Sequence, residues 1–346
     1  MKNVRVKTGS KDYSVLIGKN LLENAGALIS DVIRPCRAAV ITDDTVDALY
    51  SRILVESIEK AGFDAVKFVF PHGESSKTPE TYLDILEFLG ESRITRTDLV
   101  IALGGGVTGD MAGFAASTFL RGVHLVQIPT TLLSAVDSSV GGKTAIDLKS
   151  GKNQAGTFYQ PDLVICDYAT LDTLPEETFS EGCAEIIKYG MIWDRNLFDS
   201  MSLDVHDNLE EIIARCVEIK RDVVSQDEHD TGLRQILNFG HTFGHGIEKA
   251  SSYRISHGNA VAMGMAIVTK ASGDDASYKA LLKTLAANGL PSKCPYSTEE
   301  LFDGVLSDKK RTGETITLVL PEGIGKVRLE KMSLDDSYAY LEKGLE

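Results

Sequence analysis

The chain has 346 residues, which is enough for about two domains of roughly 150 residues each. Apolar residues make up 43% and charged residues 25% of the sequence, as in an ordinary globular protein with a sizeable core. The net charge of -14 argues against a general nucleic-acid or anionic-membrane surface, but it is compatible with a locally basic pocket.

The first half of the chain alternates between strand and helix patterns. It begins on an alternating strand pattern at residues 1–4, without a signal-peptide core. Apolar runs predict strands, helical spacing predicts a helix over 46–62, and Thr78-Pro79 predicts the start of another helix. This alternation predicts a mostly parallel sheet with helices on both faces. The predicted strands cover residues 38–42, 65–70, 99–103, 123–128 and 163–166.

The second half is dominated by long helical patterns. Strand-like runs nearly vanish until residues 316–320, so we expect a domain boundary near residues 168–178. That stretch lacks a Gly/Ser-rich or charged run, which argues against a flexible linker. The predicted helices cover residues 175–191, 209–225, 233–250, 257–271 and 277–288.

A glycine-rich turn at residues 103–113 follows a buried strand and precedes a helix. Glycines there would let backbone amides approach a phosphate at the helix N-terminus. The spacing is not that of the usual dinucleotide fingerprint, and a tight strand-to-helix turn is an equally good interpretation.

Hydroxyls, glycines and two lysines gather over residues 128–131, 137–144 and 151–153. These groups suit phosphate binding. Asp137 stands where a P-loop motif requires glycine, which argues against a P-loop. A polar surface loop is the alternative.

Two further segments carry charged or metal-binding side chains. Glu185 and Lys188 share a helical face, which on spacing alone favours a surface ion pair. His241 and His245 have the spacing of a zinc helix, although Thr242 replaces the glutamate of the H-E-x-x-H motif. Arg234 and Asn238 extend the same face backwards, and His257-Gly258 follows, so this cluster favours a functional site.

Taken together, these segments resemble the 3-dehydroquinate synthases of the sugar phosphate cyclase family. The resemblance runs from about His72 to Pro321. It rests on GGGVTGDMAGFAA, IPTTLLSAVDSSVGGKT, GKNQAGTFYQP, GCAEIIKYG, DEHDTGLRQILNFGHTFGHGIE and HGNAVAMGM, in that order.

The resemblance implies a Rossmann-like α/β N-terminal domain over 1–172, which binds NAD. An all-α C-terminal domain over 173–346 would bind substrate and one divalent metal, zinc or cobalt. The implied reaction converts 3-deoxy-D-arabino-heptulosonate 7-phosphate to 3-dehydroquinate and phosphate in the shikimate pathway of aromatic amino acid biosynthesis. It proceeds by oxidation, phosphate elimination, re-reduction, ring opening and aldol closure, so the enzyme is a carbon-oxygen lyase.

The resemblance also assigns residues to the site. The implied metal ligands are Glu185, His241 and His257, so that His245 contacts phosphate instead of metal. The implied substrate residues are Lys143, Lys188, Lys220, Arg234, Asn238, His245, Asn153, Asp137, Lys309 and, from a second subunit, Arg121. The implied NAD residues are His72, Gly73, Glu74, Ser75, Ser76, Lys77, Gly106, Val107, Thr108, Gly109, Asp110, Thr130, Thr131, Lys143, Lys152, Thr170, Leu171, Asp172 and Thr173.

The sequence departs from the family pattern at two positions. Asp230 replaces an expected glutamate, and Thr108 replaces an aliphatic residue in the glycine-rich turn. The substrate lysine near residue 309 is either Lys309 or Lys310, and we select Lys309.

Three alternatives remain. The first is a metal- and NAD-dependent polyol dehydrogenase, which needs no phosphate pocket. The second is a sibling sugar phosphate cyclase, and the third is an NAD- or metal-sensing module. The resemblance implies a homodimer. Five scattered cysteines and the lack of a membrane-length apolar run lead us to expect a cytoplasmic location, with neither nucleic acid nor membrane as partner.

Overall fold

The computed structural model describes residues 1–306 and 314–346, so Lys309 and Lys310 lie outside the described residues. The chain forms two compact units. The first comprises Met1–Leu174 together with Lys220–His229, and the second comprises Pro175–Ile219 together with Asp230–Glu346. Lys220–His229 thus belongs to the first unit, although it follows the start of the second in the sequence.

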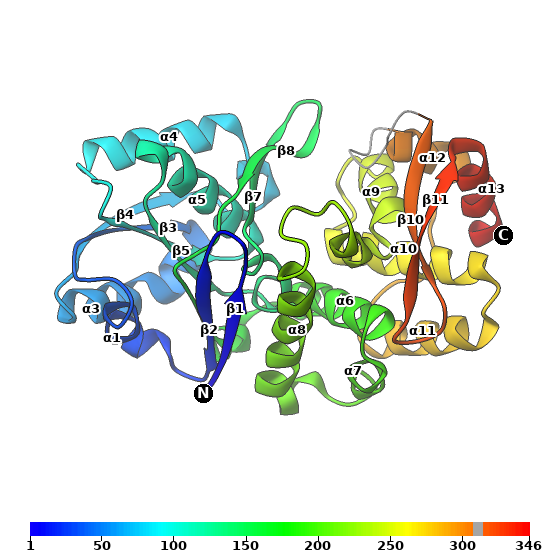
Figure 1. Ribbon diagram of the computed structural model, residues 1–346, viewed down its shortest axis with the longest axis horizontal. Coiled ribbons are helices and arrows are strands. Elements are labelled where there is room, and N and C mark those ends of the chain that lie inside the picture. Colours follow the sequence, from blue (N-terminus) through cyan, green and yellow to red (C-terminus); the bar gives the residue numbers. More distant parts are fainter. Residues whose placement is uncertain (307–313) are drawn as a thin grey trace. The chain divides into compact units, whose positions relative to one another are not determined.

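A seven-stranded sheet forms the centre of the first unit (Figure 1). Its neighbouring strands are parallel, except that the first strand pairs antiparallel with the second. All five predicted strands are confirmed. In spatial order the strands are β1 (Lys2–Lys7), β2 (Asp12–Gly18), β9 (Leu163–Asp167), β6 (His124–Pro129), β5 (Leu99–Gly104), β3 (Arg37–Asp43) and β4 (Asp64–Phe70).

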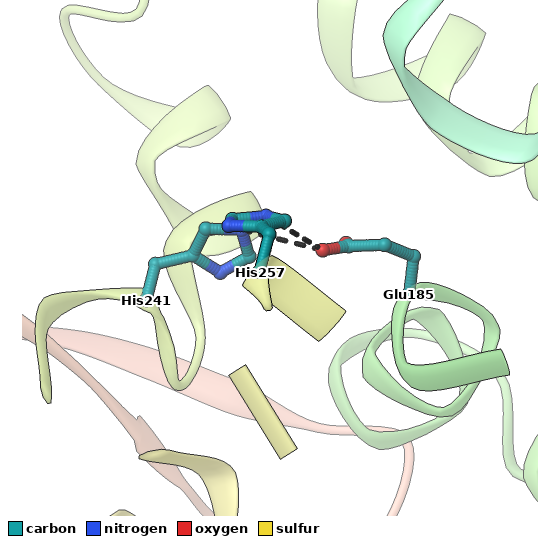
Figure 2. Close-up of side chains that lie close together, drawn as sticks. All are labelled: Glu185, His241 and His257. Carbon is teal, nitrogen blue, oxygen red and sulfur yellow. Dashed lines mark ion pairs between the residues drawn. The ribbon is translucent and has the colours of Figure 1, made fainter. Parts of the chain in front are cut away.

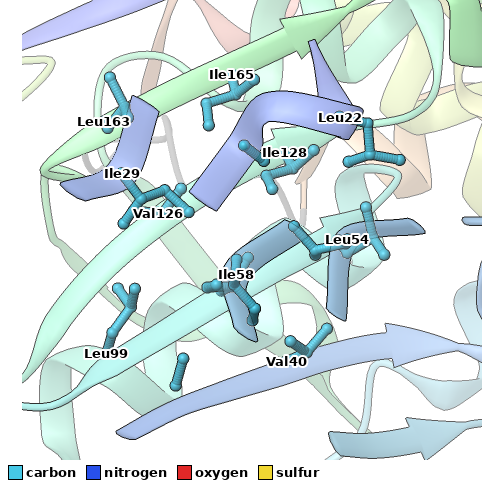
Figure 3. Packing of buried hydrophobic residues seen from close by; sticks show 14 of the residues in the cluster. Leu22, Ile29, Val40, Leu54, Ile58, Leu99, Val126, Ile128, Leu163 and Ile165 are labelled. Atoms are coloured by element: carbon cyan, nitrogen blue, oxygen red, sulfur yellow. The ribbon is translucent and has the colours of Figure 1, made fainter. Parts of the chain in front are cut away.

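Helices cover both faces of this sheet because its central strands are apolar on both sides. Along β5, Leu99 and Ile101 face one core cluster and Val100 faces the other. Ile29 and Leu54 pack on the first face (Figure 3), and both are fully buried. The covering helices are α1 (Ala25–Ser30) and α3 (Arg52–Lys60) on the first face, and α4 (Pro79–Glu91) and α5 (Gly106–Thr118) on the second.

A hairpin over residues 143–158 was not predicted as strand. It pairs β7 (Lys143–Leu148) antiparallel with β8 (Gly151–Phe158). β8 is largely exposed and contains two glycines, so it lacks the apolar alternation by which strands are recognised. Gly156 is required here, because a Cβ at that position would lie 2.0 Å from the carbonyl oxygen of Thr144.

The second unit is mostly helical, with one antiparallel hairpin, whose first strand confirms the strand predicted at 316–320. Among the described residues, no helix combines the length and apolar content that crossing a bilayer requires. The second unit contains α6 (Glu176–Ile192), α7 (Arg195–Ser200), the first turns of α8 (Leu209–Val224), η8 (Leu233–Asn238), α9 (His241–Ala250), α10 (His257–Ser272), α11 (Asp275–Ala287), α12 (Thr298–Leu306), β10 (Thr315–Pro321), β11 (Val327–Ser333) and α13 (Leu334–Leu345).

Two predicted helices are interrupted, and as continuous helices those predictions are wrong. The helix predicted over 233–250 breaks at Gly240, whose left-handed φ of 77° ends the 3-10 helix η8 and allows α9 to begin at the next residue. The helix predicted over 46–62 begins earlier, because the Asp43 carboxylate accepts hydrogen bonds from the amides of Thr45 and Val46. It contains a π-helical turn, η2 (Asp47–Ser51), before α3.

A buried carboxylate joins two loops at the end of the sheet. Asp167 is 3% exposed and ends β9. It accepts hydrogen bonds from the backbone amides of Asn20 at 2.8 Å, Leu22 at 2.9 Å and Ala169 at 3.0 Å. One side chain therefore satisfies three amides that no strand or helix partner could reach.

We predict that Asp167→Ala lowers the free energy of unfolding by about 3 kcal/mol, because the buried amides lose the charged group that accepted their hydrogen bonds. Chemical denaturation would measure this change. The matched control is Asp84→Ala, at an exposed position of α4. If Asp167→Ala destabilised the protein no more than Asp84→Ala does, the Asp167 carboxylate would not be what holds these loops together.

Candidate active site

The segments assigned to a nucleotide gather at one edge of the sheet in the first unit. Carboxyl ends of parallel strands meet at the same edge, where α/β proteins bind ligands. The 3-10 helix η3 (Glu74–Ser76) follows β4, the glycine-rich turn follows β5, Thr130-Thr131 follows β6, and the 3-10 helix η6 (Tyr168–Thr173) follows β9. The fold thus brings together four segments that are far apart in the sequence.

The glycine-rich turn has the geometry of an anion cradle. A Cβ at Gly104 would lie 2.4 Å from Thr108 Oγ1, so only glycine fits there. Gly105 caps α5 without a side-chain hydrogen bond, which leaves first-turn amides available to a ligand. Thr130 Oγ1 is buried and has no hydrogen-bond partner among the described residues. A phosphate or ribose oxygen would satisfy these donors.

Sequence reasoning missed Asp43, which ends β3 beside this turn. Thr108 Oγ1 donates a hydrogen bond of 3.4 Å to Asp43 Oδ2, and β3 pairs directly with β5. An acidic residue at the end of a strand next to the glycine turn is the usual position for binding ribose hydroxyls. The signal was an aspartate directly after an apolar run. The structure also gives Thr108, the unusual residue of this turn, a partner.

The β7–β8 hairpin and α8 bring the substrate candidates of the first unit near the same segments. Lys77 Nζ donates to Asn153 Oδ1 at 2.5 Å, and Lys152 Nζ lies 3.1 Å from Glu74 Oε1. Lys220 pairs with Asp137, donating to its carbonyl oxygen at 2.7 Å and contacting its carboxylate. Lys143 begins β7 and is exposed.

Glu185, His241 and His257 converge within the second unit. Glu185 comes from α6, and the two histidines are the first residues of α9 and α10. Figure 2 shows both imidazoles directed at the same carboxylate oxygen: Glu185 Oε1 lies 3.5 Å from His241 Nε2 and 3.4 Å from His257 Nε2. One donor atom from each residue lies within 4.8 Å of the others, which suits a metal ion.

Glycines hold the three helices close enough for this convergence. A Cβ at Gly264 would lie 2.0 Å from the carbonyl oxygen of Gly240, where α10 crosses α9. A Cβ at Gly258 would lie 2.5 Å from the Glu181 backbone, one turn before Glu185 on α6. The glycines beside the histidines therefore serve helix-to-helix contact at backbone distance.

Groups behind the imidazoles set their orientation. His241 Nδ1 lies 3.1 Å from the carbonyl oxygen of Phe239, and His257 Nδ1 lies 3.5 Å from Glu248 Oε1. Each contact favours the tautomer that leaves Nε2 free to bind a metal. Sequence reasoning missed Glu248, although it lies one turn after His245 on the same helix face.

Burial and charge set the pKa values of this cluster. Burial lowers the pKa of His241 to about 4, despite the nearby Glu185. Burial alone would also lower the pKa of His257, but Glu185 and Glu248 outweigh it and raise the value to about 10. Burial would raise the pKa of Glu185, but Lys188 and His241 hold it well below its ordinary value. The carboxylate is therefore ionised.

A second donor set overlaps the first. His245, Glu248 and His257 also offer donor atoms within 4.8 Å of one another. The His245 ring centroid lies 5.7 Å from that of His241 and 6.3 Å from that of His257. The two sets share His257, and the structure brings all three histidines together.

The remaining candidates have different surroundings. Arg234 is 1% exposed in η8, where Asn238 Nδ2 donates to the Gln235 carbonyl oxygen at 3.1 Å. Asp230 has a left-handed φ of 60°, which aspartate tolerates better than most residues. Arg121 is exposed at the end of α5 opposite the glycine-rich turn.

The fold and these residues define a protein of the dehydroquinate synthase-like class, with a parallel α/β unit and a helical unit that carries a carboxylate–imidazole centre. The models of the 3-dehydroquinate synthase N-terminal and C-terminal domains match residues 67–181 and 182–311. The chain is 40% identical to a 3-dehydroquinate synthase from Streptococcus suis, over 95% of this chain and 97% of the relative. It belongs to the 3-dehydroquinate synthase family.

Two solved structures agree with this placement. A 2-deoxy-scyllo-inosose synthase complexed with carbaglucose-6-phosphate, NAD+ and Co2+ has a TM-score of 0.90 and 26% identity, covering 99% of this chain and 100% of that one. A 2-epi-5-epi-valiolone synthase from Streptomyces hygroscopicus subsp. jinggangensis with NAD+ and Zn2+ bound has a TM-score of 0.87 and 26% identity, covering 96% and 95%.

We predict that His257→Ala abolishes stoichiometric binding of Zn2+, because it removes one of three donors, whereas His245→Ala retains it. Elemental analysis after dialysis would measure bound metal. His206→Ala, whose ring stacks on Phe179, is the matched histidine control. Loss of metal in His245→Ala together with its retention in Glu185→Gln would assign the ion to the second donor set.

Proposed function

We propose that this chain is a 3-dehydroquinate synthase that converts 3-deoxy-D-arabino-heptulosonate 7-phosphate to 3-dehydroquinate and phosphate. The observation that carries the proposal is the convergence of Glu185, His241 and His257 within 4.8 Å, in a chain whose relative bears that name. Because the nicotinamide cofactor is restored in each turnover, the enzyme is a lyase. We place it in the cytoplasm.

The donor set fits a divalent transition metal. One carboxylate oxygen and two imidazole nitrogens are typical ligands of catalytic Zn2+ or Co2+ and leave a position open for substrate. The His257 side chain is one-third exposed, so solvent or substrate can reach the centre beside this residue. When bound, the metal would act as a Lewis acid toward substrate hydroxyls. Glu185 supplies the charge that holds it.

The sheet edge of the first unit fits NAD+. The uncapped first turn of α5 suits the pyrophosphate, and Asp43 suits a ribose. When bound, the nicotinamide would accept a hydride from a substrate alcohol and later return it. We assign the remaining contacts to the segments after β4, β6 and β9, and to Lys143 and Lys152.

Buried cations explain how an acidic chain can bind a phosphorylated sugar acid. Lys188, Lys220 and Arg234 are 1%, 6% and 1% exposed. Charges removed from water act more strongly on a ligand than charges at the surface do. We assign these three to the substrate carboxylate and hydroxyls, and Lys143, Asn153, Asn238 and His245 to its phosphate.

We propose a homodimer in which Arg121 of a second subunit contacts the substrate phosphate, as the family resemblance implies. The helix between the glycine-rich turn and Arg121 has 13 residues. That length corresponds to about 20 Å, farther than an arginine side chain extends. Arg121 therefore lies too far along the chain from the glycine-rich turn to contact a ligand bound there in its own subunit.

The main alternative is a metal- and NAD-dependent polyol dehydrogenase. Such an enzyme needs no phosphate pocket, so Lys143, Lys152, Asn153 and His245 count against it. The substrate of a sibling cyclase would have no carboxylate, whereas Lys220 and Arg234 are suited to bind one. A sensing module would bind cofactor without turnover.

We predict that the protein, mixed with NAD+, Zn2+ and the heptulosonate phosphate, releases inorganic phosphate without net accumulation of NADH. A coupled phosphate assay and absorbance of the reduced nicotinamide would follow the two products. Glucose 6-phosphate serves as the comparison substrate. Stoichiometric NADH would support the dehydrogenase, and preference for the comparison substrate would support a sibling cyclase.

We predict that Arg121→Ala and His257→Ala, each inactive alone, regain about a quarter of the wild-type activity when mixed in equal amounts. Half of the random dimers would be mixed, and one of the two sites in each would be intact. Activity after subunit exchange would be measured. Full activity of Arg121→Ala alone, or no recovery on mixing, would contradict the shared site.

A further inference from the structure

Lys77 is a buried cation that links three elements of the first unit. It is 4% exposed and follows η3. Its Nζ donates to Asp110 Oδ2 in α5 at 2.6 Å and to Asn153 Oδ1 in β8 at 2.5 Å. Lys77, itself one of the residues assigned to NAD, thus contacts Asp110 of the nucleotide segment and Asn153, which is assigned to the substrate phosphate.

The chemistry of the ammonium fixes which way the Asn153 amide faces. An ammonium has three donors and no acceptor, so it can bond only the amide oxygen. Burial alone would lower the pKa of Lys77, but Asp110 and Glu74 outweigh it and raise the pKa above its ordinary value, so the group stays charged. The Asn153 amide nitrogen must then face away from Lys77.

The backbone around Asn153 is held in place as well. Asn153 has a left-handed φ of 52°, and its amide donates to Asp147 Oδ1 at 2.7 Å. The Asp147 amide in turn donates to the Lys77 carbonyl oxygen at 2.9 Å. The Asn153 side chain is exposed, and no described residue accepts a hydrogen bond from its Nδ2.

We propose that Lys77 is a positioning residue: it holds the Asn153 amide so that the NH2 group, and not the carbonyl oxygen, faces the substrate phosphate. This inference rests on the proposed function, which places a phosphate at Asn153. With the amide reversed, its oxygen would face the anion and repel it. Lys77 therefore acts on phosphate through Asn153, and its own charge is matched by Asp110.

A double-mutant cycle on the NAD+-loaded protein tests this role, with inorganic phosphate as the probe and calorimetry as the measurement. Lys77→Met removes the donor, and Asn153→Gly removes the amide while tolerating the left-handed φ. We expect each to weaken phosphate binding about ten- to hundredfold, the loss typical of one hydrogen bond to a charged group. The double variant should bind no more weakly than either single variant.

The control is Lys67→Met, which removes another lysine paired with a carboxylate, Asp47, at 2.5 Å. It should leave phosphate affinity unchanged. If Lys77→Met fails to fold because it leaves the Asp110 charge unpaired, the double variant Lys77→Met with Asp110→Asn is used in its place. Additive losses, or unaltered affinity without Lys77, would overturn the proposal. Because the probe is phosphate alone, this result is separate from whether the heptulosonate phosphate is turned over.

The ratio of KM to kcat gives a second readout. A positioning role predicts that Lys77→Met raises KM for the phosphorylated substrate by more than it lowers kcat, with an unchanged midpoint of thermal unfolding in the charge-neutral pair. A lowered midpoint of thermal unfolding in the charge-neutral pair would instead show a general collapse of the sheet edge, and would count against the proposal.

Discussion

The buried charge on Glu185 constrains the second unit more than any other single group. An ionised carboxylate at 1% exposure is costly unless cations and donors surround it. Lys188 supplies one partner from the same helix, and two imidazoles supply the others from α9 and α10. Three helices must therefore approach at backbone distance. The glycine contacts of α10 with α9 and α6 follow from that requirement, as does the break that lets α9 begin on a histidine.

The same arrangement recurs in the first unit with the cation at its centre. Lys77 pairs with Asp110, and Lys220 pairs with Asp137, as Lys188 pairs with Glu185. A chain with a net charge of -14 thus keeps Lys77, Lys188 and Lys220 away from water, and each of them pairs with its own carboxylate. The surface charge does not determine what the pockets attract, since fields are strongest where water is excluded.

The sequence predicted what depends on local pattern. Apolar runs located β3 and β5 because both strands are buried on both faces. The β7–β8 hairpin was not predicted, because an exposed strand that contains glycines lacks this apolar pattern. Spacing alone paired His241 with His245. Only resemblance to a family put Glu185 beside His241 and His257, because contact between distant helices leaves no periodic trace. Asp43 was missed for the same reason: its role depends on strand order, which one strand does not disclose.

The return of Lys220–His229 to the first unit has a consequence for biosynthesis. Glu228 accepts a hydrogen bond from the Ser10 amide at 3.1 Å and another from Gln160 Nε2 at 3.0 Å, while Lys220 holds Asp137. These ties are made by a stretch that is translated after residues 175–219 of the second unit and before residues 230–346. Ser10, Gln160 and Asp137 are therefore translated well before the segment that bonds to them, and they gain these contacts only after that segment has been synthesised. A chain that ended at residue 174 would lack Lys220 and Glu228, and so it could not make the contacts that these residues form with the first unit.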